Sequence, residues 1–229
     1  MRAARVDVVI ERRQIIAEAL GTALLVSAVV GSGIMAQRLT GDRAVALLAN
    51  TIATGGALVA ILLIFGPISG AHLNPAVTLC MVALKQQTPR SAVGYIVAQV
   101  LGGIAGAILA NAMFDLAPIT WSMTARTGLA QSLSEAVATF GLVGVVIAVG
   151  RTRAAITPFA VAAYIVAAYW FTASTSFANP AVTIARAFSD TFAGIRPGDV
   201  AGFLVAQAIG AATGALVFSW LVPLGERGR

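Results

Sequence analysis

The sequence predicts an all-α membrane protein in which six transmembrane helices surround two half-helices that meet at the midplane of the bilayer. Of its 229 residues, 59% are hydrophobic and only 10% are charged, and the mean hydropathy is +0.89. Soluble domains carry about 25% charged residues, so this composition is typical of an integral membrane protein. The pentapeptide Asn-Pro-Ala-Val-Thr occurs twice, at 74–78 and 179–183, in hydrophobic surroundings. Short helices that begin at membrane depth are typical of pores and transport sites.

Six apolar segments are long enough to cross a hydrocarbon core of about 30 Å. They cover residues 15–36, 45–66, 91–113, 130–150, 155–173 and 199–221. Two shorter apolar segments, 75–85 and 180–188, follow the two pentapeptides. About ten residues cross only half of the hydrocarbon core, so we expect half-helices there.

The two halves of the chain also resemble each other outside the pentapeptides. Glu18 and Glu135 lie in the similar hexapeptides Ala-Glu-Ala-Leu-Gly-Thr and Ser-Glu-Ala-Val-Ala-Thr, which open the first and fourth long segments. We therefore predict a single membrane channel domain over residues 1–229. It comprises two repeats and a linker, at 14–113, 130–222 and 114–129. Each repeat has three spans, an odd number, so the second repeat must be inverted across the membrane.

The distribution of lysine and arginine predicts the orientation of the chain. The side that holds both termini collects Arg2, Arg5, Arg12, Arg13, Lys85, Arg90, Arg151, Arg153, Arg227 and Arg229. The opposite side, together with the second half-helix, has only Arg38, Arg43, Arg126, Arg186 and Arg196. Because positive residues concentrate in cytoplasmic loops, we expect both termini in the cytoplasm and the protein in the cell (inner) membrane.

The composition argues against several other classes of protein. The net charge of +6 comes mostly from residues at helix ends and does not indicate a nucleic-acid partner. One histidine and one cysteine make a zinc site implausible, and Cys80 has no partner for an internal disulfide. The sequence offers no evident nucleophile–base pair. We therefore expect neither an enzyme nor a bound metal or cofactor.

The two pentapeptides carry the predicted pore chemistry. In each, the asparagine is a good N-cap and the proline a good first helical residue. The motif residues are Asn74, Pro75, Ala76, Asn179, Pro180 and Ala181. An inverted repeat points the two helix N-termini at each other, so the amides can donate to water or a hydroxylic solute while a cation meets a positive barrier. We expect residues 66–73 and 172–178 to be non-helical, with carbonyl groups that line a wet cavity.

The decapeptide Ser-Gly-Ala-His-Leu-Asn-Pro-Ala-Val-Thr at 69–78, the second Asn-Pro-Ala and the two acidic helix openings resemble the major intrinsic protein family, the aquaporins and aquaglyceroporins. The resemblance covers essentially the whole chain. It implies a right-handed helical bundle with one pore per subunit, assembled as a homotetramer in the lipid bilayer. It also implies that Glu18 and Glu135 hold the irregular loops by accepting N–H bonds. His72 either lines the pore, where protonation could gate it, or is a hydrogen-bonded residue of the loop.

The resemblance also places a selectivity filter, in which this chain departs from the family pattern. The family's second motif usually reads Asn-Pro-Ala-Arg, but residue 182 is valine. Family spacing places the filter at Thr54, Ala167, Ser176 and Val182, with Ala167 and Ser176 open to a shift of one position. This quartet has no aromatic residue, histidine or arginine. It should therefore be wider and less polar than a water-specific filter.

Arg186 lies one turn after the valine on the second half-helix. It could supply the missing filter charge from there. We instead expect it to be exposed, or to cap the C-terminal end of the half-helix while pairing with Asp190.

A neutral filter without arginine looks like that of bacterial aquaglyceroporins linked to arsenic resistance, which pass trivalent and methylated arsenicals. We therefore expect a passive channel for small uncharged solutes: glycerol-like polyols, water, and arsenicals such as arsenous acid. A water-only channel and an ion-coupled secondary transporter stay open as alternatives, since broken helices in inverted repeats also build transporters. A structural protein with a vestigial pore is a third alternative, which the short termini and loops disfavour.

Overall fold

The computed structural model describes residues 2–223, with side chains from residue 11 onward. This part of the chain holds eight α-helices and one 3₁₀ turn. They are α1 (Arg2–Leu39), α2 (Arg43–Ser69), α3 (Pro75–Ala83), α4 (Pro89–Met113), α5 (Leu129–Thr152), η1 (Ala154–Ile156), α6 (Thr157–Phe171), α7 (Pro180–Arg186) and α8 (Pro197–Leu221). Six of the helical segments are long and apolar enough to span a membrane, which confirms the predicted fold class. Arg227, Arg229 and the side chains of Arg2 and Arg5, which entered the orientation prediction, lie outside the described residues.

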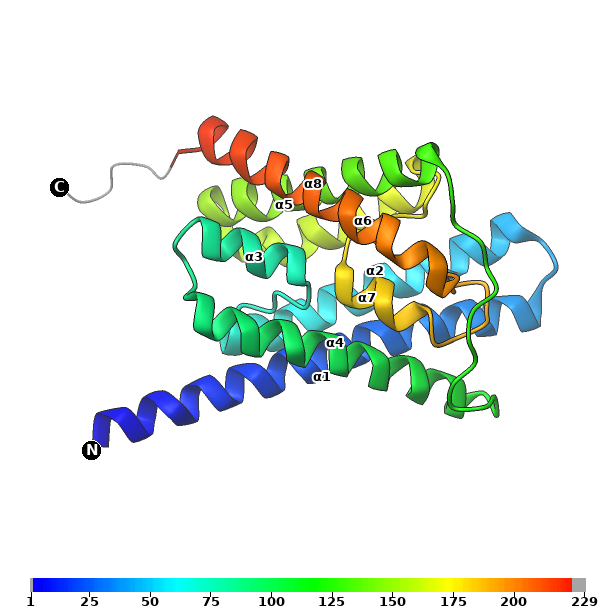
Figure 1. Cartoon of the computed structure of the whole chain (residues 1–229), viewed down its shortest axis with the longest axis horizontal. Coiled ribbons are helices and arrows are strands. Elements are labelled where there is room, and N and C mark those ends of the chain that lie inside the picture. The colour runs from blue at the N-terminus through cyan, green and yellow to red at the C-terminus, as the bar shows by residue number, and fades with distance from the viewer. Residues whose placement is uncertain (1, 224–229) are drawn as a thin grey trace.

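The second half of the chain repeats the order of the first: two long helices, a short helix and another long helix. Figure 1 shows that α1 begins and α8 ends at one end of the bundle, which we name the terminal end. The linker 114–128 lies at the opposite end, named the linker end. Both short helices begin in the middle of the bundle. From there α3 runs toward the terminal end and α7 toward the linker end (Figure 1).

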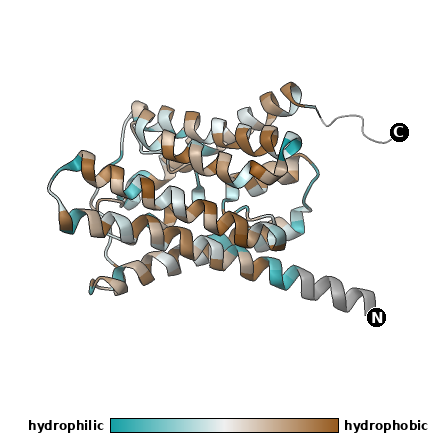
Figure 2. Ribbon diagram, turned by 180° about the vertical axis from the view of Figure 1, so that it is seen from behind, coloured by the Kyte–Doolittle hydropathy of each residue, from teal (hydrophilic) through white to brown (hydrophobic). Residues whose placement is uncertain are grey.

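Apolar residues occur along most of the length of the long helices (Figure 2). Large exposed side chains include Leu20, Ile52, Leu101, Leu133 and Val205. A large contiguous apolar surface is rare on a soluble monomer, whereas lipid tails solvate it well. The exterior is therefore suited to the hydrocarbon core of a membrane.

The end of α2 differs from the prediction made for it. We expected residues 66–69 to be non-helical, but α2 continues through Pro67 to Ser69, so that expectation is wrong. A proline removes one backbone hydrogen bond without necessarily ending the helix, particularly in a membrane bundle where neighbours cover the gap. The helix stops at Gly70, whose φ of 85° is the left-handed conformation that glycine adopts easily. The irregular segment before the first motif is therefore only 70–73.

Glycines allow two pairs of long helices to approach each other closely. A Cβ atom at Gly102 of α4 would lie 2.2 Å from the carbonyl oxygen of Ala19 on α1. A Cβ atom at Gly210 of α8 would likewise lie 2.2 Å from the carbonyl oxygen of Ala136 on α5. Because the obstructing atoms belong to the backbone, they cannot rotate away, and a larger residue must separate the helices.

We expect Gly102→Ala to destabilise the protein by about 2 kcal/mol, because the added methyl overpacks the contact between α1 and α4. Gly56→Ala is the matched control, since a Cβ atom there meets nothing within 4 Å. The control should be neutral or stabilising, because alanine favours a helix over glycine by about 1 kcal/mol. Thermal unfolding of both variants in one detergent tests this. Equal midpoints for the two variants would contradict the close approach.

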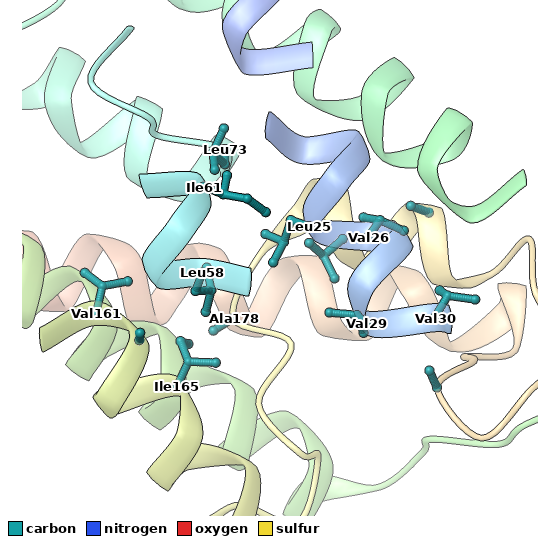
Figure 3. Close-up of a cluster of buried hydrophobic side chains, with 14 of the residues drawn as sticks. Leu25, Val26, Val29, Val30, Leu58, Ile61, Leu73, Val161, Ile165 and Ala178 are labelled. Carbon is teal, nitrogen blue, oxygen red and sulfur yellow. The ribbon is translucent and has the colours of Figure 1, made fainter. Parts of the chain in front are cut away.

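The centre of the bundle has an apolar wall built from several helices. Figure 3 shows Leu25 of α1, Leu58 of α2 and Ile165 of α6 within one cluster of buried side chains. The same cluster includes Leu73 and Ala178, the residues that precede the two motif asparagines. The irregular segments are thus anchored in the core by apolar contacts from both halves of the chain.

Candidate pore

A cavity of about 390 Å³ extends along the centre of the bundle. Gly150 and Ala154 line it near the terminal end, and Tyr169 lines it near the linker end. The side chains of Asn74 and Asn179 both lie on its wall. The cavity therefore passes the point at which the two short helices begin.

The two motif asparagines cap the short helices. Oδ1 of Asn74 accepts a hydrogen bond from Ala76 N at 2.9 Å, and Oδ1 of Asn179 accepts one from Ala181 N at 3.0 Å. Each short helix begins at the proline that follows, where the missing N–H costs nothing. The motif thus fixes the starting point of each half-helix in the middle of the bundle.

The amide nitrogens of the same asparagines join the two halves of the chain. Asn74 Nδ2 donates to the carbonyl oxygen of Ala178 at 2.8 Å. Asn179 Nδ2 donates to the carbonyl oxygen of Leu73, also at 2.8 Å. An amide group has two N–H bonds, so each asparagine keeps one for a molecule in the cavity.

A buried carboxylate on α1 holds the loop before the first motif. Glu18 accepts four hydrogen bonds, from Ser69 Oγ at 2.6 Å, His72 N at 2.9 Å, Leu73 N at 2.6 Å and Gln99 Nε2 at 2.7 Å. Each carboxylate oxygen takes two of them. Irregular backbone at membrane depth needs such partners, because lipid offers none.

A second carboxylate, on α5, holds the loop before the second motif in the same way. Glu135 accepts from Ser174 Oγ at 2.6 Å, Phe177 N at 2.8 Å, Ala178 N at 2.9 Å and Gln207 Nε2 at 2.6 Å. The donors are again one hydroxyl, two backbone amides and one glutamine. The duplicated acidic hexapeptides therefore produce two equivalent loop supports.

These loops hold strained backbone. The segment 172–178 is non-helical, as expected. Ala71, Leu73, Ser176 and Ala178 have φ values of 46°, 51°, 49° and 48°, which side-chain-bearing residues rarely adopt. Each such residue costs about 1–2 kcal/mol, and bonds to the buried carboxylates offset part of that cost.

His72 both lines the cavity and is hydrogen-bonded within the protein. Its Nδ1 lies 3.2 Å from Thr78 Oγ1, and its ring centroid lies 5.4 Å from that of Tyr95. The two alternatives considered for this residue are therefore compatible in their geometry.

Cys80 is buried and faces a separate outward groove between α3 and α8, where its Sγ donates to Ala211 O at 3.6 Å.

Three of the four residues expected at the filter line the cavity: Thr54, Ser176 and Val182. Thr54 lies on α2, Ser176 on the loop before the second motif and Val182 on α7. All three are buried. Three separate elements thus contribute small side chains to the wall of the cavity.

The placement of Ala167 is wrong, because its side chain is exposed on the outer face of α6. The cavity-facing positions of α6 recur every four residues, at Val161, Ile165 and Tyr169, as expected for one face of a helix. The allowed shift of one position does not reach this face either. Tyr169 occupies the place intended for Ala167, and its hydroxyl lies 3.3 Å from Thr54 Oγ1.

The expectation for Arg186 is also wrong. Its side chain is only 2% exposed and lines the cavity. Its Nε donates to the carbonyl oxygen of Ala193, and its guanidinium lies 3.4 Å from the ring centroid of Phe177. Asp190, the expected partner, instead accepts a hydrogen bond from Met123 N at 2.8 Å.

Six spans, two half-helices that meet in the middle and a cavity between them define a membrane channel. The family model described as Major intrinsic protein matches residues 5–172. The chain is 57% identical to Aquaglyceroporin AqpS of Rhizobium meliloti (strain 1021) over 210 residues, 92% of this chain and 90% of that relative. It is 30% identical to Probable aquaporin TIP2-2 of Oryza sativa subsp. japonica over 219 residues, 92% of this chain and 88% of that relative. The chain therefore belongs to the major intrinsic protein family, whose members are channels and not enzymes.

A solved structure shares the fold. The X-ray structure of the aquaglyceroporin from Plasmodium falciparum superposes with a TM-score of 0.73 and covers 94% of this chain and 100% of that one. The two sequences are 22% identical, so this comparison concerns the fold alone. Together, the family match and the shared fold confirm the resemblance predicted from the two Asn-Pro-Ala motifs.

Proposed function

We propose that this protein is a passive channel for small uncharged solutes of up to about glycerol size. The observation that best supports this proposal is the lining of the cavity on the linker side of the motif asparagines. Thr54, Ser176 and Val182 line the cavity there with short side chains, beside the larger Tyr169 and Arg186. Pore diameter and the hydrogen-bonding groups on the wall decide what such a channel passes.

The walls of the cavity suit solutes that have both hydroxyl groups and a carbon skeleton. Asn74 and Asn179 each keep one N–H for an acceptor oxygen. Leu58 and Ile165 supply apolar surface along the same path. A polyol could turn its hydroxyls to the amides and its C–H groups to the apolar wall.

Arsenous acid fits the same description. It is neutral at pH 7 and has three hydroxyl groups, so it resembles a small polyol. We include trivalent and methylated arsenicals among the proposed solutes, together with glycerol and water. The relative from Rhizobium meliloti, itself an aquaglyceroporin by name, supports the glycerol-sized part of this range.

The contacts of the buried acids support passive flow over ion coupling. A coupled transporter needs a carboxylate free to bind the ion or proton. Glu18 and Glu135 each accept four hydrogen bonds from the protein, so neither offers a spare acceptor to the cavity.

We further propose a homotetramer in the cell (inner) membrane with both termini in the cytoplasm. The tetramer is a property of the family, and the orientation follows from the excess of Lys and Arg at the terminal end. Native mass spectrometry in detergent measures the number of subunits. Protease cleavage of an N-terminal tag in sealed inside-out vesicles, but not in spheroplasts, would support the orientation, and the reverse pattern would contradict it.

The proposal is tested by stopped-flow light scattering on proteoliposomes that are exposed in turn to water, glycerol and arsenous acid gradients. We expect all three permeabilities to exceed those of protein-free liposomes, and an ionophore that collapses ion gradients should leave them unchanged. Fast water flux with background glycerol flux would mean a water-only channel. Saturable solute uptake that the ionophore abolishes would mean a coupled transporter.

A further inference from the structure

Arg186 is the cavity-lining residue whose role the proposed function leaves open. It lies four residues after Val182 on α7, so both side chains are on one face of the helix, about 6 Å apart along its axis. Because α7 runs from the middle of the bundle toward the linker end (Figure 1), Arg186 lies nearer the linker end than Val182 does. A solute moving along the cavity therefore meets the two residues in succession.

The guanidinium of Arg186 is fixed in position but only partly satisfied. Its side chain is 98% buried by the protein, one nitrogen is bonded to a backbone carbonyl, and its plane lies against Phe177. A guanidinium has five N–H donors. Among residues 11–223, no protein atom accepts a hydrogen bond from either of its Nη atoms. A buried cation with a single hydrogen-bond acceptor is costly, so the contents of the cavity must supply further acceptors.

A second arginine, Arg126, holds in place the loops that surround Arg186. Arg126 of the linker lies 4.8 Å from the ring centroid of Phe177. Its nitrogens donate to the carbonyl oxygens of Gly194 at 2.8 Å, Ser174 at 3.1 Å and Phe192 at 3.3 Å. Burial lowers the pKa of Arg126 to about 10, so it stays charged at neutral pH. Unlike Arg186, it does not line the cavity, so it acts as a positioning residue with a positive charge.

We propose that Arg186 selects solutes by charge in this pore, one helical turn nearer the linker end than Val182. Its Nη groups donate hydrogen bonds to the oxygen atoms of passing solutes, and its charge excludes cations. The inference rests on the proposed function and assigns a specificity-determining residue to it. Selection by size and selection by charge then occur at two different levels of the cavity, so one can be altered without the other.

Arg186→Gln separates these effects, because glutamine keeps a donor and similar bulk but removes the charge. We expect the leak of protons into proteoliposomes, measured with an internal pH-sensitive dye while valinomycin lets potassium compensate the charge, to rise on the order of tenfold. Glycerol permeability should change less than threefold, because Thr54, Ser176 and Val182 are unchanged in this variant. Arg186→Lys should keep the leak at the level of the unmodified protein. Arg43→Gln is the matched control, since Arg43 is exposed at the same end of the bundle and does not line the cavity.

The outcomes separate this inference from the proposed function. A glycerol-permeable protein whose Arg186→Gln variant leaks no more than Arg43→Gln, at equal incorporation, overturns the role of Arg186 alone. A protein that passes no neutral solute overturns the proposed function first. If Arg186→Gln and Arg186→Lys both fail to fold while Arg43→Gln folds, Arg186 is a structural residue and the proposal is wrong. In a folded, leaky Arg186→Gln background, adding Val182→Arg should restore cation exclusion and reduce glycerol flux.

Discussion

Replacing Val182 with arginine should reduce glycerol permeation at least about tenfold, equivalent to a barrier increase of about 1.4 kcal/mol, while water permeation falls much less. Val182 lines the cavity, as Thr54 and Ser176 do, so a long side chain at this position narrows the cavity from one side. The new guanidinium would also lie one turn from Arg186, where like charges at i,i+4 repel each other. Stopped-flow permeabilities for water and glycerol at equal incorporation measure the effect.

Two control variants identify the cause of such a loss. Val182→Leu adds bulk without charge and should reduce glycerol flux moderately. Ala167→Leu should change nothing, because Ala167 is exposed on the outer face of α6. If Ala167→Leu lowered glycerol flux as much as Val182→Arg, the register of α6 described above would be wrong. Glycerol flux that is unchanged in Val182→Arg would remove Val182 from the filter.

The spans and half-helices could be predicted because they depend on local and strongly repeated signals. Proline after an asparagine N-cap defines the start of each short helix, and α3 and α7 begin at those prolines. Glu18 and Glu135 were recognisable because they occupy the same place in two similar hexapeptides. Their hydrogen bonds are equivalent donor by donor, since a duplicated sequence meets a duplicated backbone problem in each half.

Ala167 could not be placed correctly from spacing alone. The assignment counts back from Asn179 across an irregular loop that contains left-handed residues, and each residue of error turns the helix by about 100°. The pattern of α6 itself was the better signal. Positions 161, 165 and 169 follow one another at intervals of four and form the face on which Tyr169 lines the cavity.

The environment of Arg186 depends on contacts that no local pattern contains. Its Nε partner, Ala193, lies in the loop after α7, and the aromatic ring against it comes from the loop before α7. Arg126, far earlier in the chain, holds both loops in place through their carbonyls. The sequence offered one usable signal, the spacing of four residues from Val182, which places the two side chains on one helix face.

Glu135→Gln should be among the most damaging single substitutions in this chain. The carboxylate accepts four hydrogen bonds, so an amide at this position turns an NH₂ group toward two donors. Each lost bond to a buried charged acceptor costs about 1.5–3 kcal/mol, so two should cost at least about 3 kcal/mol. For a chain of this length, that corresponds to a melting temperature lower by about 6–12 °C.

The two buried carboxylates support equivalent loops, so the same substitution should be damaging at both positions. Glu18→Gln should cause a loss of similar size, since Glu18 has the same four kinds of donor. Glu11→Gln, near the terminal end of α1, is the matched control and should leave the melting temperature within about 1 °C, as is usual for substitutions away from buried networks. Thermal unfolding in detergent compares all three, and glycerol flux in proteoliposomes should fall with Glu18→Gln and Glu135→Gln only. Wild-type melting of either variant would mean that the left-handed residues before Asn74 and Asn179 are held by the apolar cluster around Leu73 and Ala178, and not by the carboxylates.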